Sequence, residues 1–273
     1  MKNNTNFKCH NCGASLSFNN FLKELDSTLH KQYTLEKFKE GHTGKNFVVE
    51  EPKFEFKKPV FKKSLDLPRA TEVPVAKEYL EKRKLNPEKF YFTDKFKEWT
   101  NTQKVTFDTI GRDESRIIIP MYDKDNNLIG FQGRSLVPNS VKYITVMLDE
   151  EAPKIYGLNE VNDKLPVYVV EGPFDSTFVN NSVALCGSDG DVRCLEGSSV
   201  VFVYDNEPRN REIVNRINKC IARGEKVVIW PSAILEKDIN DMVLSGLNVM
   251  DVIESNTYSG LEAKVKFNNW KKI

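Results

Sequence analysis

The sequence predicts an α+β and α/β protein in which a mainly parallel sheet follows a mixed module of strands and helices. Three observations support this fold class. After Leu165, short β-branched runs alternate with helix-like segments, which is typical of parallel strands covered on both faces. Before that point, an apolar run, a polar turn and a second strand indicate a hairpin. The 273 residues, 40% of them apolar, leave room for about two domains.

Composition excludes several classes of protein. No apolar run approaches the roughly 20 residues that span a bilayer, and the first residues lack the features of a signal peptide. The five cysteines are widely scattered, which favours reduced thiols over a disulfide framework. We therefore expect a protein of the cytoplasm with no membrane partner.

Residues 1–45 combine a C-x-x-C turn with a helical unit. Cys9 and Cys12 frame the turn, and this spacing presents two thiolates to one Zn²⁺. Apolar residues then recur at helical spacing through residues 17–42. Because zinc takes four ligands and the chain has no second C-x-x-C, the pair predicts only half of a zinc site.

The next two segments are an extended linker and a basic module. Residues 46–68 contain three prolines and alternate lysine with phenylalanine, without a helical stripe. Residues 69–163 follow, with a helix predicted at 73–85 and a hairpin that turns at Asp123–Asn127. Between residues 53 and 104 there are 14 Lys/Arg against 8 Asp/Glu, a pattern that suits a polyanion or a solvated surface.

Residues 164–250 carry the repeated strand and helix pattern, and residues 251–273 form a C-terminal tail. The tail interleaves lysine with Phe267 and Trp270. Three roles remain open for it: stacking on single-stranded bases, docking on a partner, or packing against the sheet.

Acidic residues follow three of the predicted strands. Glu171 ends the first, Asp205 and Glu207 end the second, and Asp238 follows the third before a helix. Since parallel strands deliver their carboxyl ends to one edge, these side chains should converge there. Such a cluster is costly unless a cation fills it, and oxygen ligands without histidine suit Mg²⁺ or Mn²⁺. The alternative is that Asp205, Glu207 and Asp238 are helix caps and first-turn charges.

The acidic motifs resemble those of a known domain. The ordered set VVEGPFDS, YDNEPRN and KDINDMV is similar to the Toprim domain of primases and topoisomerases. The resemblance implies that Glu171 is the glutamate of its first motif and Asp205 the first aspartate of its second. Glu207 stands where that family has an aspartate, and Asp238 falls in the third motif. EGxxD alone is a weak signal, whereas the ordered set is specific.

The segment before these motifs narrows the resemblance. RIIIPMYDKDNNLIGFQGRSL, VKYITV and KIYGL resemble the region that precedes Toprim in bacterial replicative primases, and nearly the whole chain is similar to primases of T-even-like bacteriophages. The resemblance implies that four basic residues hold template phosphate and incoming triphosphate. They are Arg116, Arg134, Lys142 and Lys154.

The N-terminal turn matches only the second half of that family's zinc ribbon. A truncated or split gene, a wrongly chosen start codon and a degenerate ribbon are the alternatives, and a missing first half is favoured because Cys9 and Cys12 precede a well-formed helix pattern. A redox C-x-x-C is a weaker interpretation, because no thioredoxin-like strand precedes it.

The resemblance implies a DNA-dependent RNA primase in the host-cell cytoplasm. It would use Mg²⁺ or Mn²⁺ to join ribonucleoside triphosphates into short primers on single-stranded DNA, beside a replicative helicase. Glu171, Asp205 and Glu207 would be catalytic. A Toprim nuclease would use the same acidic edge to hydrolyse a phosphodiester. A third alternative is an inactive, primase-derived module that recruits template or helicase.

Overall fold

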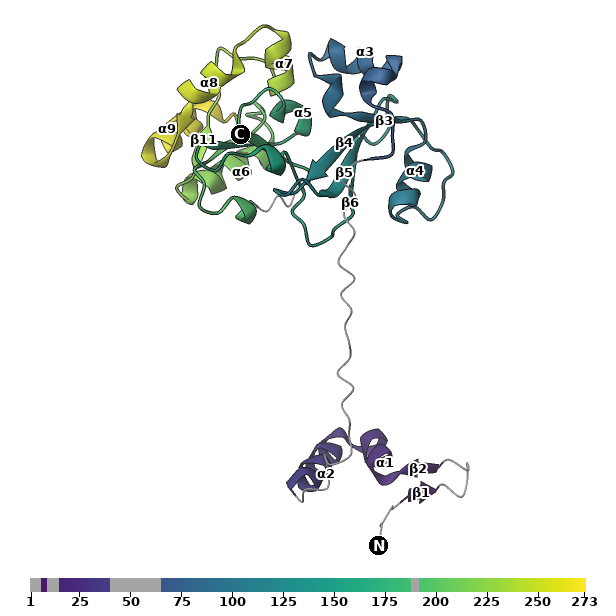
Figure 1. The fold of residues 1–273 in the computed structure, drawn as a ribbon. Helices are drawn as coiled ribbons and strands as arrows, with labels where there is room; N and C mark the ends of the chain where they lie inside the picture. The colour runs from purple at the N-terminus through teal and green to yellow at the C-terminus, as the bar shows by residue number, and fades with distance from the viewer. Residues whose placement is uncertain (1–5, 9–14, 40–64, 188–191) are drawn as a thin grey trace. The chain divides into compact units, whose positions relative to one another are not determined.

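The computed structural model describes residues 6–8, 15–39, 65–187 and 192–273. The chain divides into two compact units, Met1–Lys58 and Pro59–Ile273, and each is described by itself. Purple marks the first unit and blue to yellow the second (Figure 1). The predicted linker at 46–68 lies outside the described residues up to residue 64.

The N-terminal unit pairs a small hairpin with two helices. Its elements are β1 (Asn6–Lys8), β2 (Ser15–Ser17), α1 (Phe18–Leu25) and α2 (Ser27–Lys39). Ser17 accepts the Asn20 N–H at 3.3 Å and so caps α1, while Asp26 accepts the Thr28 N–H at 2.7 Å at the start of α2. The predicted helical unit is confirmed, with a break at Asp26.

The second unit begins with a four-stranded antiparallel sheet whose strands follow one another in sequence order. They are β3 (Tyr91–Thr93), β4 (Arg116–Tyr122), β5 (Leu128–Ser135) and β6 (Tyr143–Met147). The predicted hairpin is confirmed: Asp123 accepts the N–H groups of Asp125 and Asn127, and Asn126 takes a left-handed conformation with φ of 61°.

Short helices flank this sheet. They are α3 (Pro74–Lys82), α4 (Phe96–Gln103) and 3₁₀ turns at Ala70–Glu72 and Pro87–Lys89. Proline at the first turn of α3 fits a helix start, where its missing N–H has no intrahelical acceptor.

The second sheet has six strands in the order β12-β11-β10-β8-β9-β7. The four central strands are parallel, and an antiparallel strand lies at each edge. The mainly parallel sheet is therefore confirmed. Its strands are β7 (Ile155–Tyr156), β8 (Val167–Val170), β9 (Ser182–Leu185), β10 (Val200–Val203), β11 (Lys226–Val228) and β12 (Thr257–Tyr258).

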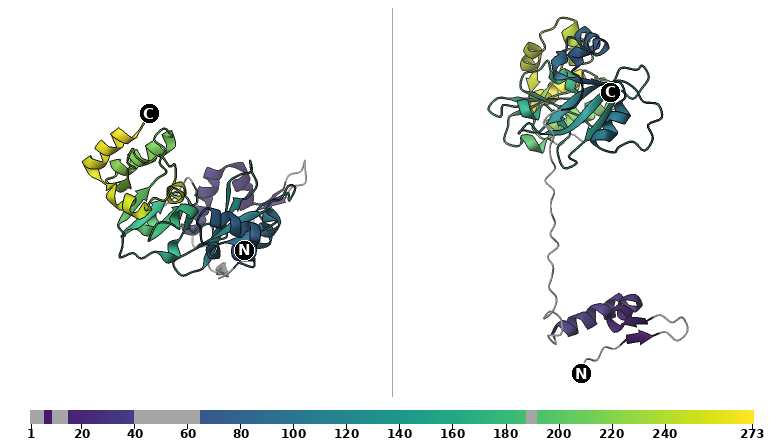
Figure 2. Two further views of the ribbon diagram at one scale, coloured as in Figure 1. Left: turned by 90° about the horizontal axis from the view of Figure 1, so that it is seen from above. Right: turned by 45° about the vertical axis from the view of Figure 1, so that its right-hand side comes forward.

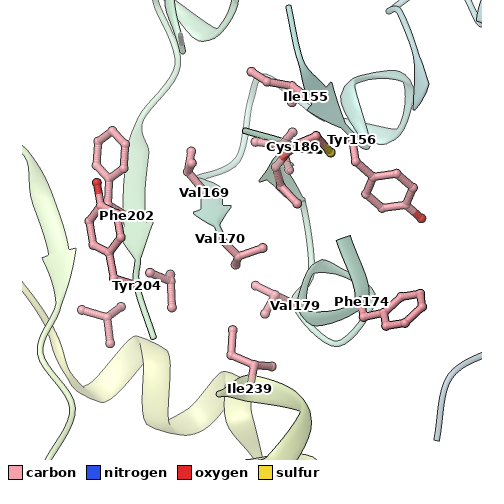
Figure 3. Close-up of a cluster of buried hydrophobic side chains, with 14 of the residues drawn as sticks. Ile155, Tyr156, Val169, Val170, Phe174, Val179, Cys186, Phe202, Tyr204 and Ile239 are labelled. Atoms are coloured by element: carbon pink, nitrogen blue, oxygen red, sulfur yellow. Dashed lines mark hydrogen bonds between the residues drawn. The ribbon is translucent and has the colours of Figure 1, made fainter. Parts of the chain in front are cut away.

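Both faces of the parallel sheet are covered. Tyr204 lies with its hydroxyl 3.3 Å from the Cys220 sulfur of α6, and its ring stacks on Phe202. Val201 and Val203 point to the opposite face by strand alternation and are also buried. Figure 3 shows Val170, Val179 and Ile239 directed toward one another within this core.

The helices of this unit connect and cover the strands. They are α5 (Pro173–Ser176), α6 (Arg211–Ala222), α7 (Ile239–Leu244), α8 (Val249–Ser255) and α9 (Gly260–Trp270), with 3₁₀ turns at Leu158–Glu160 and Arg193–Leu195. One hydrophobic core includes side chains from both sheets. The domain boundary predicted between residues 163 and 164 falls between β7 and β8. Because β7 belongs to the same six-stranded sheet as β8, this boundary would divide one sheet between two domains.

The predicted C-terminal tail, residues 251–273, is part of the folded unit. It contains the end of α8, then β12 and α9, and α9 buries Ala263, Phe267 and Trp270. Of the three roles left open for it, packing against the sheet is the one observed.

The basic module is tied to the parallel sheet through α3 and α7. Arg83 donates from Nη1 to the Asn240 side-chain oxygen at 2.7 Å, and Lys84 donates to the Val243 carbonyl at 2.8 Å. The blue helix α3 and the yellow-green helix α7 accordingly lie side by side in Figures 1 and 2.

Candidate active site

Two adjacent parallel strands bring the first two acidic residues together. Val170 of β8 is in register with Val203 of β10, and Glu171 and Asp205 follow these strands. The Asp205 N–H donates to Glu171 Oε2 at 3.1 Å. The two residues therefore lie at one edge of the sheet, as the parallel pattern predicts.

Glu207 and Asp238 lie within electrostatic reach of this pair. Glu207 forms an ion pair with Lys237 at 3.1 Å, and this contact raises the pKa of Lys237. Asp238 is the N-cap of α7 and accepts the Asp241 N–H at 2.8 Å. Its carboxylate thus has the capping role weighed as an alternative, and its charge also acts on Asp205.

A fifth acid, Asp175, belongs to the same cluster and was not singled out from the sequence. It accepts the Asn240 N–H at 3.0 Å, and burial and the charge of Asp238 raise its pKa to about 7. A Cβ at Gly172 would lie 2.8 Å from Asp175 Oδ2, so glycine leaves room for this carboxylate. The EGxxD spacing was the signal that could have identified it.

Asp205 is the most perturbed carboxyl group of the cluster. Burial raises its pKa to about 8, with further contributions from the charges of Glu171, Asp175, Asp238 and Glu207. Burial also raises the pKa of Glu171, although the Asp205 N–H and the charge of Arg216 oppose that effect. Several acids in a poorly solvated place cannot all ionise unless positive charge is supplied.

Part of that positive charge comes from the protein itself. Arg216 of α6 lies 3.1 Å from Glu171 Oε1 and also pairs with Glu212. The sequence offered no signal for Arg216, because a charged residue on an amphipathic helix is usually a surface residue. Within the described ranges, no group of three or more His, Cys, Asp or Glu side chains is spaced to hold a metal ion.

The donor chemistry nevertheless fits a divalent cation. Carboxylate oxygens are the ligands that Mg²⁺ prefers, and the Asp205 carboxylate accepts no hydrogen bond from the described part of the chain. A cavity of about 370 Å³ lies beside Glu171 and Arg216, and Gln132 and Tyr143 of the four-stranded sheet line its other side. Of the acidic cluster, Glu171 lines this cavity.

Of the four predicted basic residues, Lys142 lies within electrostatic reach of the acids, and Arg134 lies near Lys142. Lys142 has its pKa lowered by desolvation and then by the charges of Arg134 and Arg83, while Asp238 acts in the opposite direction. The Arg134 guanidinium lies 4.8 Å from the ring centre of Tyr143, and its buried Nε and Nη1 have no hydrogen-bond partner among the described residues. Guanidinium nitrogens without acceptors are suited to an anion such as phosphate. Arg83 completes this positive group and was not predicted from the sequence.

Arg116 and Lys154 make other contacts. Arg116 is 2% exposed, pairs with Glu114 and donates to the Gly133 carbonyl at 2.7 Å. Its guanidinium is therefore committed to the protein interior, contrary to the predicted phosphate contact. Lys154 is exposed and lines a different cavity, together with Lys104 and Glu150.

The structure does not describe the residues of the predicted half zinc site. Cys9 and Cys12 lie outside the residues that the structure describes, so the zinc prediction remains a prediction. Across the described residues, no helix has both the length and the apolar character needed to cross a bilayer.

The chain is similar in sequence to a bacteriophage DNA primase. Over 288 aligned residues the chain is 33% identical to the DNA primase of Enterobacteria phage T4, and the alignment spans 99% of this chain and 83% of that protein. No protein-family model matches the sequence.

Solved structures show the same fold at lower identity. A DnaG catalytic core aligns with a TM-score of 0.55 at 21% identity, covering 74% of this chain and 79% of the other. The zinc-binding and RNA polymerase domains of the Aquifex aeolicus primase align with a TM-score of 0.51 at 20% identity, covering 97% and 73%. These likenesses confirm the predicted fold class, an α+β module followed by a Toprim-like sheet.

Proposed function

Because the chain belongs to the family of the bacteriophage T4 DNA primase, we propose that it makes short RNA primers by nucleotidyl transfer at the acidic edge of its parallel sheet. The observation that carries this assignment is the hydrogen bond from the Asp205 N–H to Glu171, which joins the ends of two adjacent strands. Rigid strands hold the reacting groups, and the loops beyond them leave space for nucleotide.

Asp205 and Glu207, with Asp238, would hold Mg²⁺ or Mn²⁺. When bound, the cation neutralises charge on the triphosphate and orients the attacking and leaving oxygens. Asp205 supplies a carboxylate that accepts no hydrogen bond from the described residues, and Glu207 would exchange its ion pair with Lys237 for this role. Lys237 is then free to contact a phosphate oxygen.

Glu171 would be a further metal ligand or accept the proton of the attacking 3′-hydroxyl. A general base is most effective when its pKa lies near the working pH, and burial raises the pKa of Glu171 in that direction. Arg216 holds one Glu171 oxygen, which leaves the other directed to the Asp205 N–H.

The basic group opposite the acids would hold the phosphates. Arg134 offers two guanidinium nitrogens that have no acceptor in the described part of the chain, and Lys142 lies close enough to sense the charges of both Arg134 and Asp238. Arg134 can fork onto two phosphate oxygens, whereas Lys142 acts as a point charge.

The partners follow from this chemistry. The substrates are ribonucleoside triphosphates and a single-stranded DNA template, and one solved catalytic domain of the same fold has single-stranded DNA bound to it. We place the reaction in the host-cell cytoplasm beside a replicative helicase. Cys9 and Cys12 would supply two of four ligands to a Zn²⁺ ion.

The test is synthesis of labelled RNA on single-stranded DNA with ribonucleotides and Mg²⁺, with and without a starting dinucleotide. Glu171→Gln should abolish product in both arms, while Glu254→Gln, an exposed glutamate of α8, should retain it. Product from the wild type only with the dinucleotide would indicate an intact catalytic core that lacks initiation. Cut DNA without RNA would instead identify a nuclease, and neither product would favour a recruiting module.

A further inference from the structure

Asn206 lies between Asp205 and Glu207 in the sequence, and its side chain makes hydrogen bonds of its own. Its Nδ2 donates to the carbonyl oxygens of Ile234 at 3.0 Å and Glu236 at 3.1 Å. Its backbone N–H donates to the Lys237 carbonyl at 2.7 Å. The loop that carries Asp205 is thereby attached to the segment that precedes α7.

Trp270 of α9 completes the hydrogen bonding of this amide. The indole Nε1 donates to Asn206 Oδ1 at 3.0 Å. Because an indole nitrogen can only donate, this contact requires the amide oxygen to face Trp270 and the amide nitrogen to face the two carbonyls. Both hydrogens of the amide and its oxygen are then satisfied in one orientation. Trp270 is itself held, since it is 7% exposed and stacks on Phe267.

Two more contacts hold the same loop at its ends. The Lys272 N–H donates to the Pro208 carbonyl at 2.8 Å, and Trp230 Nε1 donates to the Tyr204 carbonyl at 2.7 Å. Residues from the C-terminal end of the chain therefore contact the loop at both Asn206 and Pro208.

The loop is braced by these bonds rather than by close packing. A cavity of about 560 Å³ borders it, and Asn206, Pro208, Trp230 and Trp270 are among the residues that line it. A loop beside a cavity keeps its geometry only if specific contacts hold it.

We infer that Asn206 and Trp270 are positioning residues that set the spacing of Asp205 and Glu207, so that helix α9 determines how tightly the site binds a divalent cation. The inference rests on the proposed metal-binding role of those two acids. It assigns α9 a part in the active site that neither of its alternative roles, stacking on bases or docking on a partner, would require.

The test measures Mn²⁺ binding directly, by electron paramagnetic resonance, in the full-length chain. Trp270→Phe keeps the aromatic packing and removes the indole donor, and it should raise the Mn²⁺ dissociation constant about 5-fold, the effect of one lost hydrogen bond. Val265→Ala, at an exposed position of the same helix, is the control, and its dissociation constant should stay within about 2-fold of the wild type.

Asn206→Ser provides a second variant at the other end of the contact. It should weaken Mn²⁺ binding at least as much as Trp270→Phe, and combining the two should add little, because both remove the same interaction. Wild-type Mn²⁺ affinity in Trp270→Phe or in Asn206→Ser would overturn the inference. Wild-type affinity in Asp205→Asn would instead overturn the proposed metal site itself.

Discussion

Arg216 Nη1 lies 3.1 Å from Glu171 Oε1, so the glutamate that ends β8 is already paired with a cation of the protein. The side chains of both residues are largely buried, with 24% and 20% exposure. An ion pair at this depth is screened less than a surface pair. Arg216 therefore competes with any divalent cation that approaches Glu171.

We expect Arg216→Gln to tighten Mn²⁺ binding. Removing one positive charge next to the acids increases their attraction for a cation, and the dissociation constant should fall about 5-fold. Titration at about pH 9 is needed, because losing Arg216 also raises the pKa of Glu171. Arg211→Gln, an exposed arginine of the same helix, should leave the constant unchanged. Unchanged or weaker binding in Arg216→Gln would contradict this account of the pair.

We expect Asp205→Asn to stabilise the metal-free protein at high pH. The pKa of Asp205 is about 8 in the folded state against 3.8 for the free group, so the folded state retains a proton that the unfolded chain releases. Stability therefore falls as pH rises from about 4 through about 8. At about pH 8.5 in a chelator, the variant should gain roughly 3 kcal/mol, since each pKa unit corresponds to about 1.4 kcal/mol and coupling among the acids reduces the total.

Urea unfolding at about pH 5 and about pH 8.5 measures this difference. Asp125→Asn, in an exposed turn, is the control and should follow the wild type. A residual slope should remain in Asp205→Asn, because Asp175 also has a raised pKa. If Asp205→Asn is no more stable than the wild type at about pH 8.5, then ionisation of Asp205 does not destabilise the folded state.

We expect Arg116→Met to lower stability rather than nucleic-acid affinity. Arg116 neutralises Glu114, which is 20% exposed and also accepts the Ser140 hydroxyl at 2.7 Å. Removing one partner of a buried ion pair costs about 3 kcal/mol or more. Urea unfolding should show this loss, and Arg116→Met combined with Glu114→Gln should recover part of it. If Arg116→Met left the stability unchanged but abolished template binding, Arg116 would contact phosphate as the sequence predicted.

We expect Lys142→Met to weaken binding of single-stranded DNA or nucleotide more than Lys154→Met does. Lys142 lies with Arg134 and Arg83 opposite the acids, whereas Lys154 lies beside Glu150 at another cavity. Fluorescence anisotropy of a labelled oligonucleotide across salt concentrations should show a slope reduced by about 0.7 for one lost phosphate contact. If the two substitutions weakened binding equally, the difference in position between Lys142 and Lys154 would not show where the nucleic acid binds.

The sequence patterns were sufficient to predict that Glu171 and Asp205 lie together at one edge of the parallel sheet. Strands of β-branched residues alternating with helices predicted parallel pairing, and parallel pairing places Glu171 and Asp205 side by side whatever their separation along the chain. The structure agrees, because Val170 and Val203 are in register. The EGxxD spacing also contained Asp175, whose proximity to Asp205 became evident only from the fold.

The basic residues were predicted less well. Arg116 and Arg134 both lie in the hairpin, and a pattern of residues along a strand does not tell which charged side chain will meet a carboxylate. Arg116 faces Glu114 and the Phe96 ring, while Arg134 lies against Tyr143 and its Nε and Nη1 have no acceptor within the described ranges. The difference depends on which distant segments pack on each side of the sheet.

Local sequence thus specified the strands, the turn at Asp123 and the order of the acids, because these depend on backbone preference and side-chain period. Tertiary packing decided the rest. It joined Asn206 to Trp270 and Arg83 to Asn240, and it buried Arg116, through contacts between residues far apart in the chain. Desolvation and the charges of neighbours, which set the pKa of Asp205, exist only once those contacts have formed.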